Sequence, residues 1–226
     1  MDSGRVTAAM DSGRGAVLEG GTRVVLVRHG VTANTLAGRL DGRGGSDPPL
    51  DPLGSAQARA TAALVPSLLG DPPVRLVTSS LRRVRMTGAE IAATIGVPAE
   101  VDPDWDERAF GDWDGLSLAE VTQRYPREWA RLRRDPTNAP PGGESRAEVA
   151  TRVRAAFARA TSAPGTVVVV TSRVPLLCVL TETLHIEPDR FWALATEPAS
   201  VSVVELWPDG HVSVPVVNRT DHLPGR

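Results

Sequence analysis

An arginine and a histidine stand directly after an apolar run near the start of the chain. Residues 24–27 are four aliphatic residues bounded by turn-forming ones, which predicts a strand buried on both faces in a mostly parallel sheet. Ligands of open α/β sheets bind beyond the carboxyl ends of the strands, so Arg28 and His29 stand where chemistry usually takes place. The alternative is a strand end that happens to be polar, but Arg-His-Gly-x-Thr at residues 28–32 is a much rarer combination.

Three further stretches accompany this one. Residues 79–87 read Ser-Ser-Leu-Arg-Arg-Val-Arg-Met-Thr, residues 107–115 read Glu-Arg-Ala-Phe-Gly-Asp-Trp-Asp-Gly, and residues 140–145 read Pro-Pro-Gly-Gly-Glu-Ser. Together with residues 28–32, they resemble the motifs of the histidine phosphatase superfamily, the phosphoglycerate-mutase-like proteins. The resemblance implies an α/β fold, a three-layer α/β/α sandwich with a mostly parallel central sheet.

The resemblance also implies a role for four side chains. In that family the histidine is a nucleophile that becomes a transient phosphohistidine, which here is His29, and Arg28 and Arg83 hold the phosphoryl oxygens. Glu107 becomes the general acid that protonates the leaving oxygen. Each residue type suits its task, because the planar arginine fork donates bidentate hydrogen bonds to phosphate and a neutral imidazole offers a lone pair to phosphorus. A carboxylic acid in a closed pocket can supply the proton.

The chain departs from the family where the predicted third strand ends. The family delivers a second histidine there, whereas this chain reads Thr171-Ser172-Arg173. Ser172 could donate one neutral hydrogen bond to the phosphate, and Arg173 could restore the positive charge. Alternatively, Arg173 could occupy the phosphate subsite or pair with Glu107, which would disable hydrolysis. Loss of one stabilising donor commonly costs roughly 10²–10³ in rate, which leaves a slow enzyme. Asp41, in the loop after the first strand, stands where the family has a glutamine.

Buried strands and helices are expected to position these residues. Strands are predicted over residues 24–27, 74–79 and 166–171, with the third beside the first, and residues 200–206 and 212–217 read as a closing hairpin. Helices are predicted over about 52–69, 81–95, 145–160 and 175–184, and two short helices between 118 and 134 are separated at Pro126. Arg82 and Arg85 are interpreted as solvated, because one helix turn cannot point three arginines at one site.

The chain of 226 residues is predicted to form one domain. Residues 1–21 are small, polar and glycine-rich, so we interpret them as a flexible N-terminal tail. Residues 22–218 form the histidine-phosphatase-like domain, within which residues 104–145 are an insertion that could roof the pocket. Residues 219–226 are expected to be a polar C-terminal tail.

Composition limits the partners that the chain is expected to have. A net charge of −2 gives no general attraction to nucleic acid or anionic membrane, and no apolar stretch approaches the length of a bilayer span. We therefore expect a cytoplasmic protein with a small phosphorylated or anionic substrate, and a homodimer is left open. Cys178 lies in an apolar run and is interpreted as a core residue. No metal or other cofactor is implied, since the arginines and His29 can do a metal's work.

Two functional hypotheses follow. The first is a phosphomonoester hydrolase, a histidine-type acid phosphatase that acts on a small phosphorylated metabolite through a phosphohistidine at His29. The second is a catalytically impaired or repurposed protein of the same fold, which binds an anionic ligand or catalyses a different reaction. The presence of both His29 and Glu107 favours catalysis, because a binder needs no acid and a carboxylate would repel an anion. The missing second histidine favours the alternative.

Overall fold

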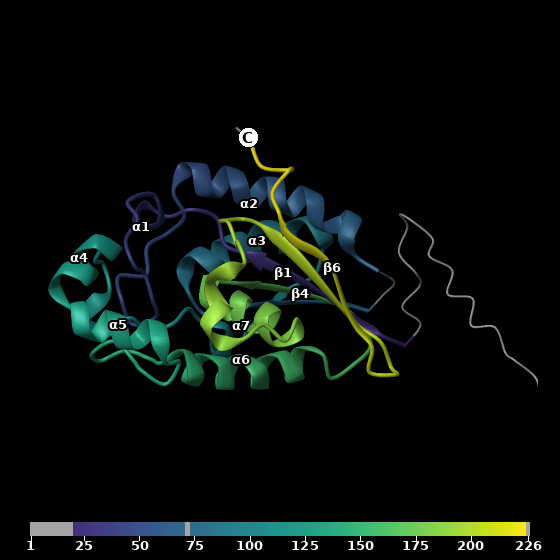
Figure 1. Ribbon diagram of the computed structural model, residues 1–226. Coiled ribbons are helices and arrows are strands. Elements are labelled where there is room, and N and C mark those ends of the chain that lie inside the picture. The colour runs from purple at the N-terminus through teal and green to yellow at the C-terminus, as the bar shows by residue number, and fades with distance from the viewer. Residues whose placement is uncertain (1–19, 71–72, 225–226) are drawn as a thin grey trace, which may run out of the picture.

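The computed structural model describes residues 20–70 and 73–224, and a six-stranded sheet runs through the centre of this part (Figure 1). Its strands are β1 (Thr22–Arg28), β2 (Val74–Thr78), β3 (Ala99–Val101), β4 (Gly165–Thr171), β5 (Val201–Leu206) and β6 (Val212–Arg219), in the spatial order β3-β2-β4-β1-β5-β6. β1 to β4 run parallel, while β5 and β6 form an antiparallel hairpin beside β1. The mostly parallel sheet, the neighbouring β1 and β4 and the closing hairpin are confirmed.

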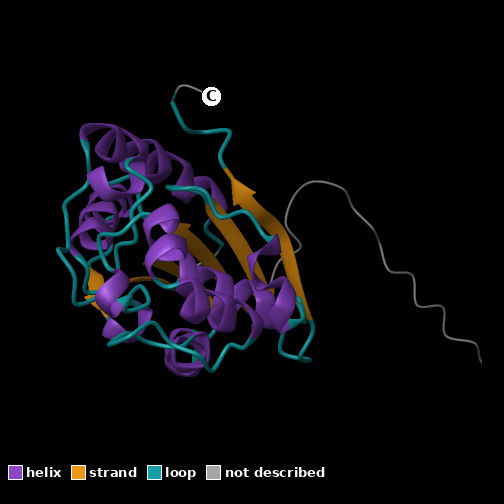
Figure 2. Cartoon of the chain, turned by 60° about the vertical axis from the view of Figure 1, so that its left-hand side comes forward, coloured by secondary structure: helices purple, strands orange, loops and turns teal. Residues whose placement is uncertain are grey.

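Helices cover both faces of the sheet (Figure 2). They are α1 (Ala33–Leu36), α2 (Pro52–Leu64), α3 (Arg82–Ile95), α4 (Leu118–Arg124), α5 (Pro126–Arg134), α6 (Arg146–Ala160) and α7 (Arg173–Thr183). Short 3₁₀ turns occupy Val65–Leu68, Pro103–Trp105, Gly111–Trp113 and Pro188–Ala193. Residues of α2 and α3 pack on one face and residues of α6 and α7 on the other, which confirms the three-layer sandwich. α4 and α5 lie beyond the end of the sheet (Figure 1).

The side chains of β1 show why its sequence is continuously apolar. Val25 and Val27 pack into the core beneath α2 and α3. Val24 and Leu26 point the other way, into the core beneath α6 and α7. All four are fully buried, as expected for a central strand that is covered on both faces.

Local signals define most helix ends, with two differences from expectation. Asp51 caps α2 through the Leu53 N–H as predicted, but the α-helix ends at Leu64 and continues as a 3₁₀ turn, because Pro66 has no N–H to donate. α7 begins two residues earlier than predicted, since a helix tolerates Pro175 within its first turn. The break between α4 and α5 and the capping box at the start of α6 are confirmed.

The two ends of the chain differ in what the structure describes. Of the predicted N-terminal tail, residues 1–19 lie outside the described residues. Near the other end, Leu223 is buried and Nε2 of His222 lies 3.0 Å from Oγ1 of Thr61 on α2. This end therefore packs on the domain where a polar tail was expected, because it carries one apolar and one hydrogen-bonding side chain. Within residues 20–70 and 73–224, no helix is long and apolar enough to cross a membrane.

Candidate active site

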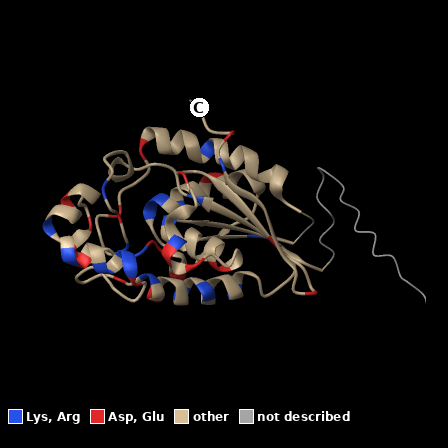
Figure 3. Cartoon of the chain, viewed as in Figure 1, with Lys and Arg blue, Asp and Glu red and all other residues tan. Residues whose placement is uncertain are grey.

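The predicted nucleophile and two arginines predicted to bind phosphate meet where β1 and β2 end. Arg28 is the last residue of β1, His29 follows it, and Arg83 lies in the first turn of α3, shortly after β2. We call these three residues the phosphate floor. Exposed Arg82 and Arg85 flank buried Arg83, so the interpretation of the two neighbours as solvated is confirmed. Charged residues of both signs are drawn around these loops and over α4 and α5 in Figure 3.

The imidazole of His29 is buried and held in one tautomer. Its Nδ1 lies 2.7 Å from the carbonyl oxygen of Gly30, and since a carbonyl can only accept, Nδ1 carries the proton. Nε2 keeps its lone pair and accepts a hydrogen bond from Nε of Arg83 at 3.3 Å. Burial, followed by the charges of Arg83 and Arg28, lowers the pKa of His29 well below its usual value of 6.5. The ring is therefore neutral near pH 7.

The backbone around His29 is fixed by close packing. Its N–H donates to the carbonyl of Thr171 on β4, and its carbonyl accepts from the N–H of Ala199. A Cβ on Gly30 would lie 2.4 Å from the carbonyl oxygen of Gly54 on α2, so a larger residue does not fit there. Backbone contacts from three directions thus hold the imidazole in place.

Arg28 supplies a second buried positive charge. Its Nη1 donates to the carbonyl of Thr196, while its Nε is buried without a hydrogen-bond partner. Burial is the main cause that lowers its pKa to about 10, and the charge of Arg173 adds to it. The guanidinium therefore remains protonated near pH 7.

The side chain of Glu107 is held by two backbone N–H groups, one of which belongs to the first turn of α7. Its Oε1 accepts the N–H of Arg108 at 2.7 Å, and its Oε2 accepts the N–H of Val174 at 3.3 Å. The side chain is buried, and Val174 lies in the first turn of α7, where unpaired N–H groups favour a negative charge. The predicted acid therefore lies beside the segment in which the family carries its second histidine.

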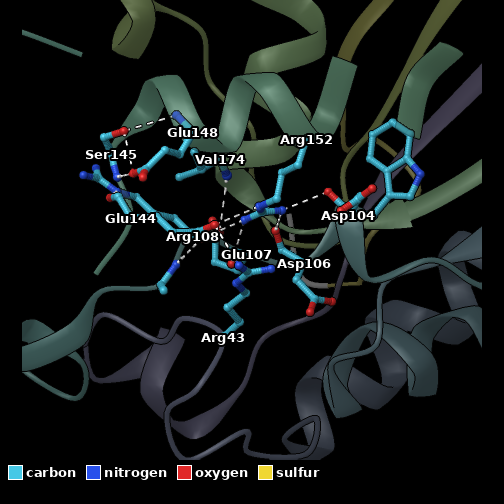
Figure 4. A network of polar contacts seen from close by, with 12 residues as sticks. Arg43, Asp104, Asp106, Glu107, Arg108, Glu144, Ser145, Glu148, Arg152 and Val174 are labelled. Carbon is cyan, nitrogen blue, oxygen red and sulfur yellow. Dashed lines mark hydrogen bonds and ion pairs between the residues drawn. The ribbon is translucent and has the colours of Figure 1, made fainter. Parts of the chain in front are cut away.

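Arg152 of α6 organises the loop that carries Glu107 (Figure 4). It donates to the backbone carbonyls of Asp104, Asp106 and Glu107 and pairs with the carboxylate of Glu144 at 3.0 Å. We did not predict this role from the sequence. A signal was present, because position 152 falls on the same helix face as buried residues 149 and 156.

A cavity of about 500 Å³ joins these groups. Five of the predicted site residues line it: Arg28, His29, Arg83, Glu107 and Arg173. Ser172 is not among its lining residues, and its buried hydroxyl has no hydrogen-bond partner. Most of the remaining wall is apolar or aromatic: Leu40, Phe110, Trp113, Leu118, Trp129, Leu132, Val174 and Trp192.

The guanidinium of Arg173 lies over the ring of Trp192, 5.3 Å from its centre. In the described part of the chain, no ion pair joins Arg173 to Glu107. The aromatic stacking directs Arg173 toward Trp192, so the alternative in which it pairs with Glu107 is not the arrangement found.

Asp41 is a second carboxylate in the cavity wall. Its backbone carbonyl accepts from Nη2 of Arg83 at 2.8 Å, and its Oδ1 lies 3.3 Å from Nη1 of the same arginine. Burial, as the largest cause, raises the pKa of Asp41 to about 6. The sequence singled out this position as a departure from the family, but it did not show the burial.

Two other groups of chemical interest can be placed. Cys178 on α7 is buried, and burial raises the pKa of its thiol to about 12, in line with its interpretation as a core residue. Within residues 20–70 and 73–224, no group of three or more His, Cys, Asp or Glu side chains is arranged to hold a metal ion.

Comparison with known proteins places this geometry in context. A family model described as the histidine phosphatase superfamily (branch 1) matches residues 24–219. A bifunctional protein of Mycobacterium tuberculosis is 35% identical over 204 residues, which cover 89% of this chain and 55% of that protein. Glucosyl-3-phosphoglycerate phosphatase of the same organism is 38% identical over 133 residues, covering 58% of this chain and 57% of the relative. This chain thus spans little more than half the length of these two relatives.

A relative that is matched over most of its length and a solved structure extend the comparison. Phosphoserine phosphatase 1 of Hydrogenobacter thermophilus is 29% identical over 188 residues, covering 81% of this chain and 86% of that protein. The structure of mycobacterial glucosyl-3-phosphoglycerate phosphatase in complex with VO3 is 29% identical, with a TM-score of 0.77. The alignment covers 88% of this chain and 99% of the chain in that structure.

Proposed function

Because the chain belongs to the histidine phosphatase superfamily, we propose that it hydrolyses a phosphate monoester of a small metabolite through a phosphohistidine at His29. The observation that carries this proposal is the buried, neutral imidazole of His29. Its Nδ1 donates to a carbonyl, and its Nε2 lone pair lies among the groups of a cavity that Arg28 and Arg83 also line. A nucleophile for phosphorus needs this combination of orientation and surrounding positive charge.

In the first half-reaction, a bond forms between Nε2 of His29 and phosphorus, and the bond between phosphorus and the ester oxygen breaks. Arg28 and Arg83 stabilise the charge on the phosphoryl oxygens. The hydrogen bond from Arg83 to Nε2 gives way to contacts with those oxygens when the phosphoryl group enters. Glu107 transfers its proton to the leaving oxygen, so the alcohol departs neutral.

In the second half-reaction, water attacks the phosphohistidine. Glu107, now ionised, accepts a proton from the water, the phosphorus–nitrogen bond breaks, and His29 returns to its neutral form. The hydrogen bonds from Arg108 and Val174 support the ionised carboxylate during this step. One water is consumed, and one alcohol and one phosphate are released.

Arg173 takes over the charge of the missing second histidine in this proposal. It lines the cavity, stacks on Trp192, and is close enough to Arg28 to lower the pKa of that residue. These observations support a contact between Arg173 and the phosphoryl oxygens. A phosphate contact of Ser172 stays a prediction, because its hydroxyl is unpaired but lies outside the cavity lining.

The cavity also indicates the kind of alcohol that the ester carries. A volume of about 500 Å³ accommodates a small metabolite, and its tryptophan and leucine side chains favour a leaving group with an apolar or ring face. Two relatives are named as phosphatases of glucosyl-3-phosphoglycerate and phosphoserine, which supports a small phosphorylated metabolite as the substrate class. The cytoplasmic location, the homodimer that the sequence leaves open and the domain limits stay predictions.

The proposal is tested by phosphate release from p-nitrophenyl phosphate and a panel of sugar phosphates, across acidic to neutral pH. The natural protein is expected to be active and His29→Ala inactive, and quenching in alkaline detergent, in which a phosphorus–nitrogen bond survives, is expected to trap a phosphoprotein only in the natural protein. Equal activity of the two proteins would contradict the role of His29. If both were inactive on every ester, hydrolysis would be rejected in favour of anion binding.

A further inference from the structure

Asp41 is a carboxylate that the proposed mechanism does not use. Its side chain is only 8% exposed, it lines the cavity, and neither of its carboxylate oxygens has a hydrogen-bond partner. Glu107, the other cavity carboxylate considered above, accepts two backbone N–H groups. A buried carboxylate with one long ion pair and no well-formed hydrogen bond is costly, so its environment favours the neutral acid or a ligand that supplies a partner.

The charged and polar groups around Asp41 come from four segments. Arg83 of α3 places Nη1 3.3 Å from its Oδ1, and the same Nη1 lies 3.6 Å from Oδ1 of Asp47. The carboxylate of Asp114 and the amide of Asn34 also act on Asp41. Burial, Asp114 and Asp47 raise the pKa of Asp41, while Arg83 and Asn34 lower it, and the result is about 6.

A phosphoryl dianion must approach the same guanidinium. Nη1 of Arg83 is buried and makes no hydrogen bond, and its carboxylate contacts with Asp41 and Asp47 are long, at 3.3 and 3.6 Å, so it can turn to an entering oxyanion. An ionised Asp41 beside it would repel the dianion and compete for Arg83. A neutral Asp41 would instead donate its O–H to an oxyanion oxygen, a short and strong type of hydrogen bond.

We propose that Asp41 binds the phosphoryl group as a neutral carboxylic acid, so that ligand binding takes up one proton from solution. The proton joins a carboxylate oxygen of Asp41 when the oxyanion enters and returns to solution when phosphate leaves. The inference rests on the proposed function only in placing the phosphoryl group between His29 and Arg83. It makes Asp41 a residue that confines tight binding to acidic pH.

The expected pH dependence has a definite sign. Below about pH 6, Asp41 is largely protonated in the free protein, and affinity for a divalent oxyanion is at its highest. Above that value the carboxylate must first take up a proton, so the affinity falls by about tenfold for each pH unit. His29 is neutral near pH 7 in the free protein, because its pKa is lowered well below the usual value, and a proton taken up by His29 on sulfate binding would persist in Asp41→Asn.

Sulfate is a suitable probe, because it keeps two negative charges across the whole range. Its affinity is measured by isothermal titration calorimetry from acidic to slightly alkaline pH, in two buffers of different ionisation enthalpy. For the natural protein, we expect the tenfold loss per pH unit and an uptake of about one proton per sulfate above the pKa of Asp41. Asp41→Asn, which keeps a neutral donor, should bind sulfate with an affinity that changes by less than about twofold and with no linked proton.

Asp47→Asn is the matched control, because Asp47 faces the same Nη1 but its side chain is 43% exposed. It should keep the tenfold loss per pH unit and the uptake of about one proton, with the whole dependence moved to slightly lower pH, because the charge of Asp47 helps to raise the pKa of Asp41. A pH-independent affinity in the natural protein, an equal slope in Asp41→Asn, or a folded Asp41→Asn that binds no sulfate would each overturn the role of Asp41. Proton-linked sulfate binding without hydrolysis would instead overturn the proposed function alone. Absence of binding in all three proteins would overturn both.

Discussion

The phosphate floor and the segment over it, residues 104–145, are held by different means. The floor residues follow strand ends, and His29 is fixed by backbone hydrogen bonds to Thr171 and Ala199. We call residues 104–145 the roof. Its acid, Glu107, lies outside regular structure and depends on Arg152 of α6 and on the first turn of α7. The proposed nucleophile is thus positioned by the sheet itself, whereas the proposed acid is positioned by the Arg152 side chain and by backbone N–H groups of Arg108 and α7.

The two cavity carboxylates show the same contrast in their surroundings. Glu107 of the roof accepts two backbone N–H groups, while Asp41, next to the floor, accepts none and lies beside Arg83. Identical chemical groups are thereby suited to different tasks. In the proposals above, Glu107 exchanges a proton with the leaving oxygen, and Asp41 binds the oxyanion as the neutral acid.

Removing Glu107, the proposed acid of the roof, should give the largest effect. The size of this effect should depend on the leaving group. In Glu107→Gln, kcat/KM for an alkyl phosphate should fall by about 10³, because an alkoxide cannot leave unprotonated. For p-nitrophenyl phosphate the loss should be only several-fold, since that leaving group needs no proton. Steady-state kinetics on both esters test this. Equal losses on the two esters would show that Glu107 does not act as the general acid.

Removing a floor charge should give a smaller loss that is independent of the leaving group. In Arg83→Gln, kcat/KM should fall by about 10² for aryl and alkyl esters alike, because the phosphoryl group is common to both. Arg82→Gln changes the neighbouring exposed arginine and should stay within about twofold. A loss in Arg83→Gln that follows the basicity of the leaving group would contradict the division between floor and roof.

Replacing Arg152, which holds the roof through its backbone carbonyls, should lower both the free energy of unfolding and the activity that depends on proton transfer from Glu107. Arg152→Met removes the donor to three backbone carbonyls and leaves the largely buried Glu144 with one fewer partner. We expect a loss of about 2 kcal/mol in the free energy of unfolding, measured in urea. We also expect alkyl esters to be affected more than aryl esters, as in Glu107→Gln.

The control for this variant lies on the same helix. Arg154→Met breaks an exposed ion pair with Glu182, which should cost less than about 1 kcal/mol and leave activity unchanged. If Arg152→Met lowered stability but affected both ester types equally, its role would be structural, and the acid would not depend on it.

The smallest expected effect concerns His222, near the C-terminal end, which contacts Thr61 on α2. Burial is the main cause that lowers the pKa of His222, so the folded state favours the neutral ring that contacts Thr61. The neutral ring of His222 therefore adds to the stability of the folded state above pH 6.5, and this contribution is lost as the pH falls through the lowered pKa of His222. Between neutral and acidic pH, Tm should therefore fall slightly more for the natural protein than for His222→Asn.

Exposed His211 offers the comparison for that measurement. His211→Asn should keep the pH dependence of Tm found in the natural protein. Identical pH dependence in His222→Asn and the natural protein would show that His222 does not link the C-terminal end to the domain.

Much of the fold was predictable because its signals are local. Apolar runs located β1, β2 and β4, Asp51 and Ser145 located two helix starts, and Pro126 separated α4 from α5. The grouping of Arg28, His29, Arg83 and Glu107 was predicted from motifs that resemble those of the family, and these four residues line one cavity. The roles of Arg152 and Trp192 at the site, and of His222 at the C-terminal end, were missed, since their partners lie far away in the sequence.

Motifs that resemble those of the family singled out the three residues of the phosphate floor, and the ends of buried parallel strands, which meet at one edge of a sheet, explain why they come together. The contacts of the two carboxylates are visible only in the fold. Glu107 takes a hydrogen bond from a residue 67 positions away, and Asp41 faces an arginine 42 positions away. The burial and charge that set a carboxylate's proton affinity come from such contacts, and the order of residues along the chain does not show them.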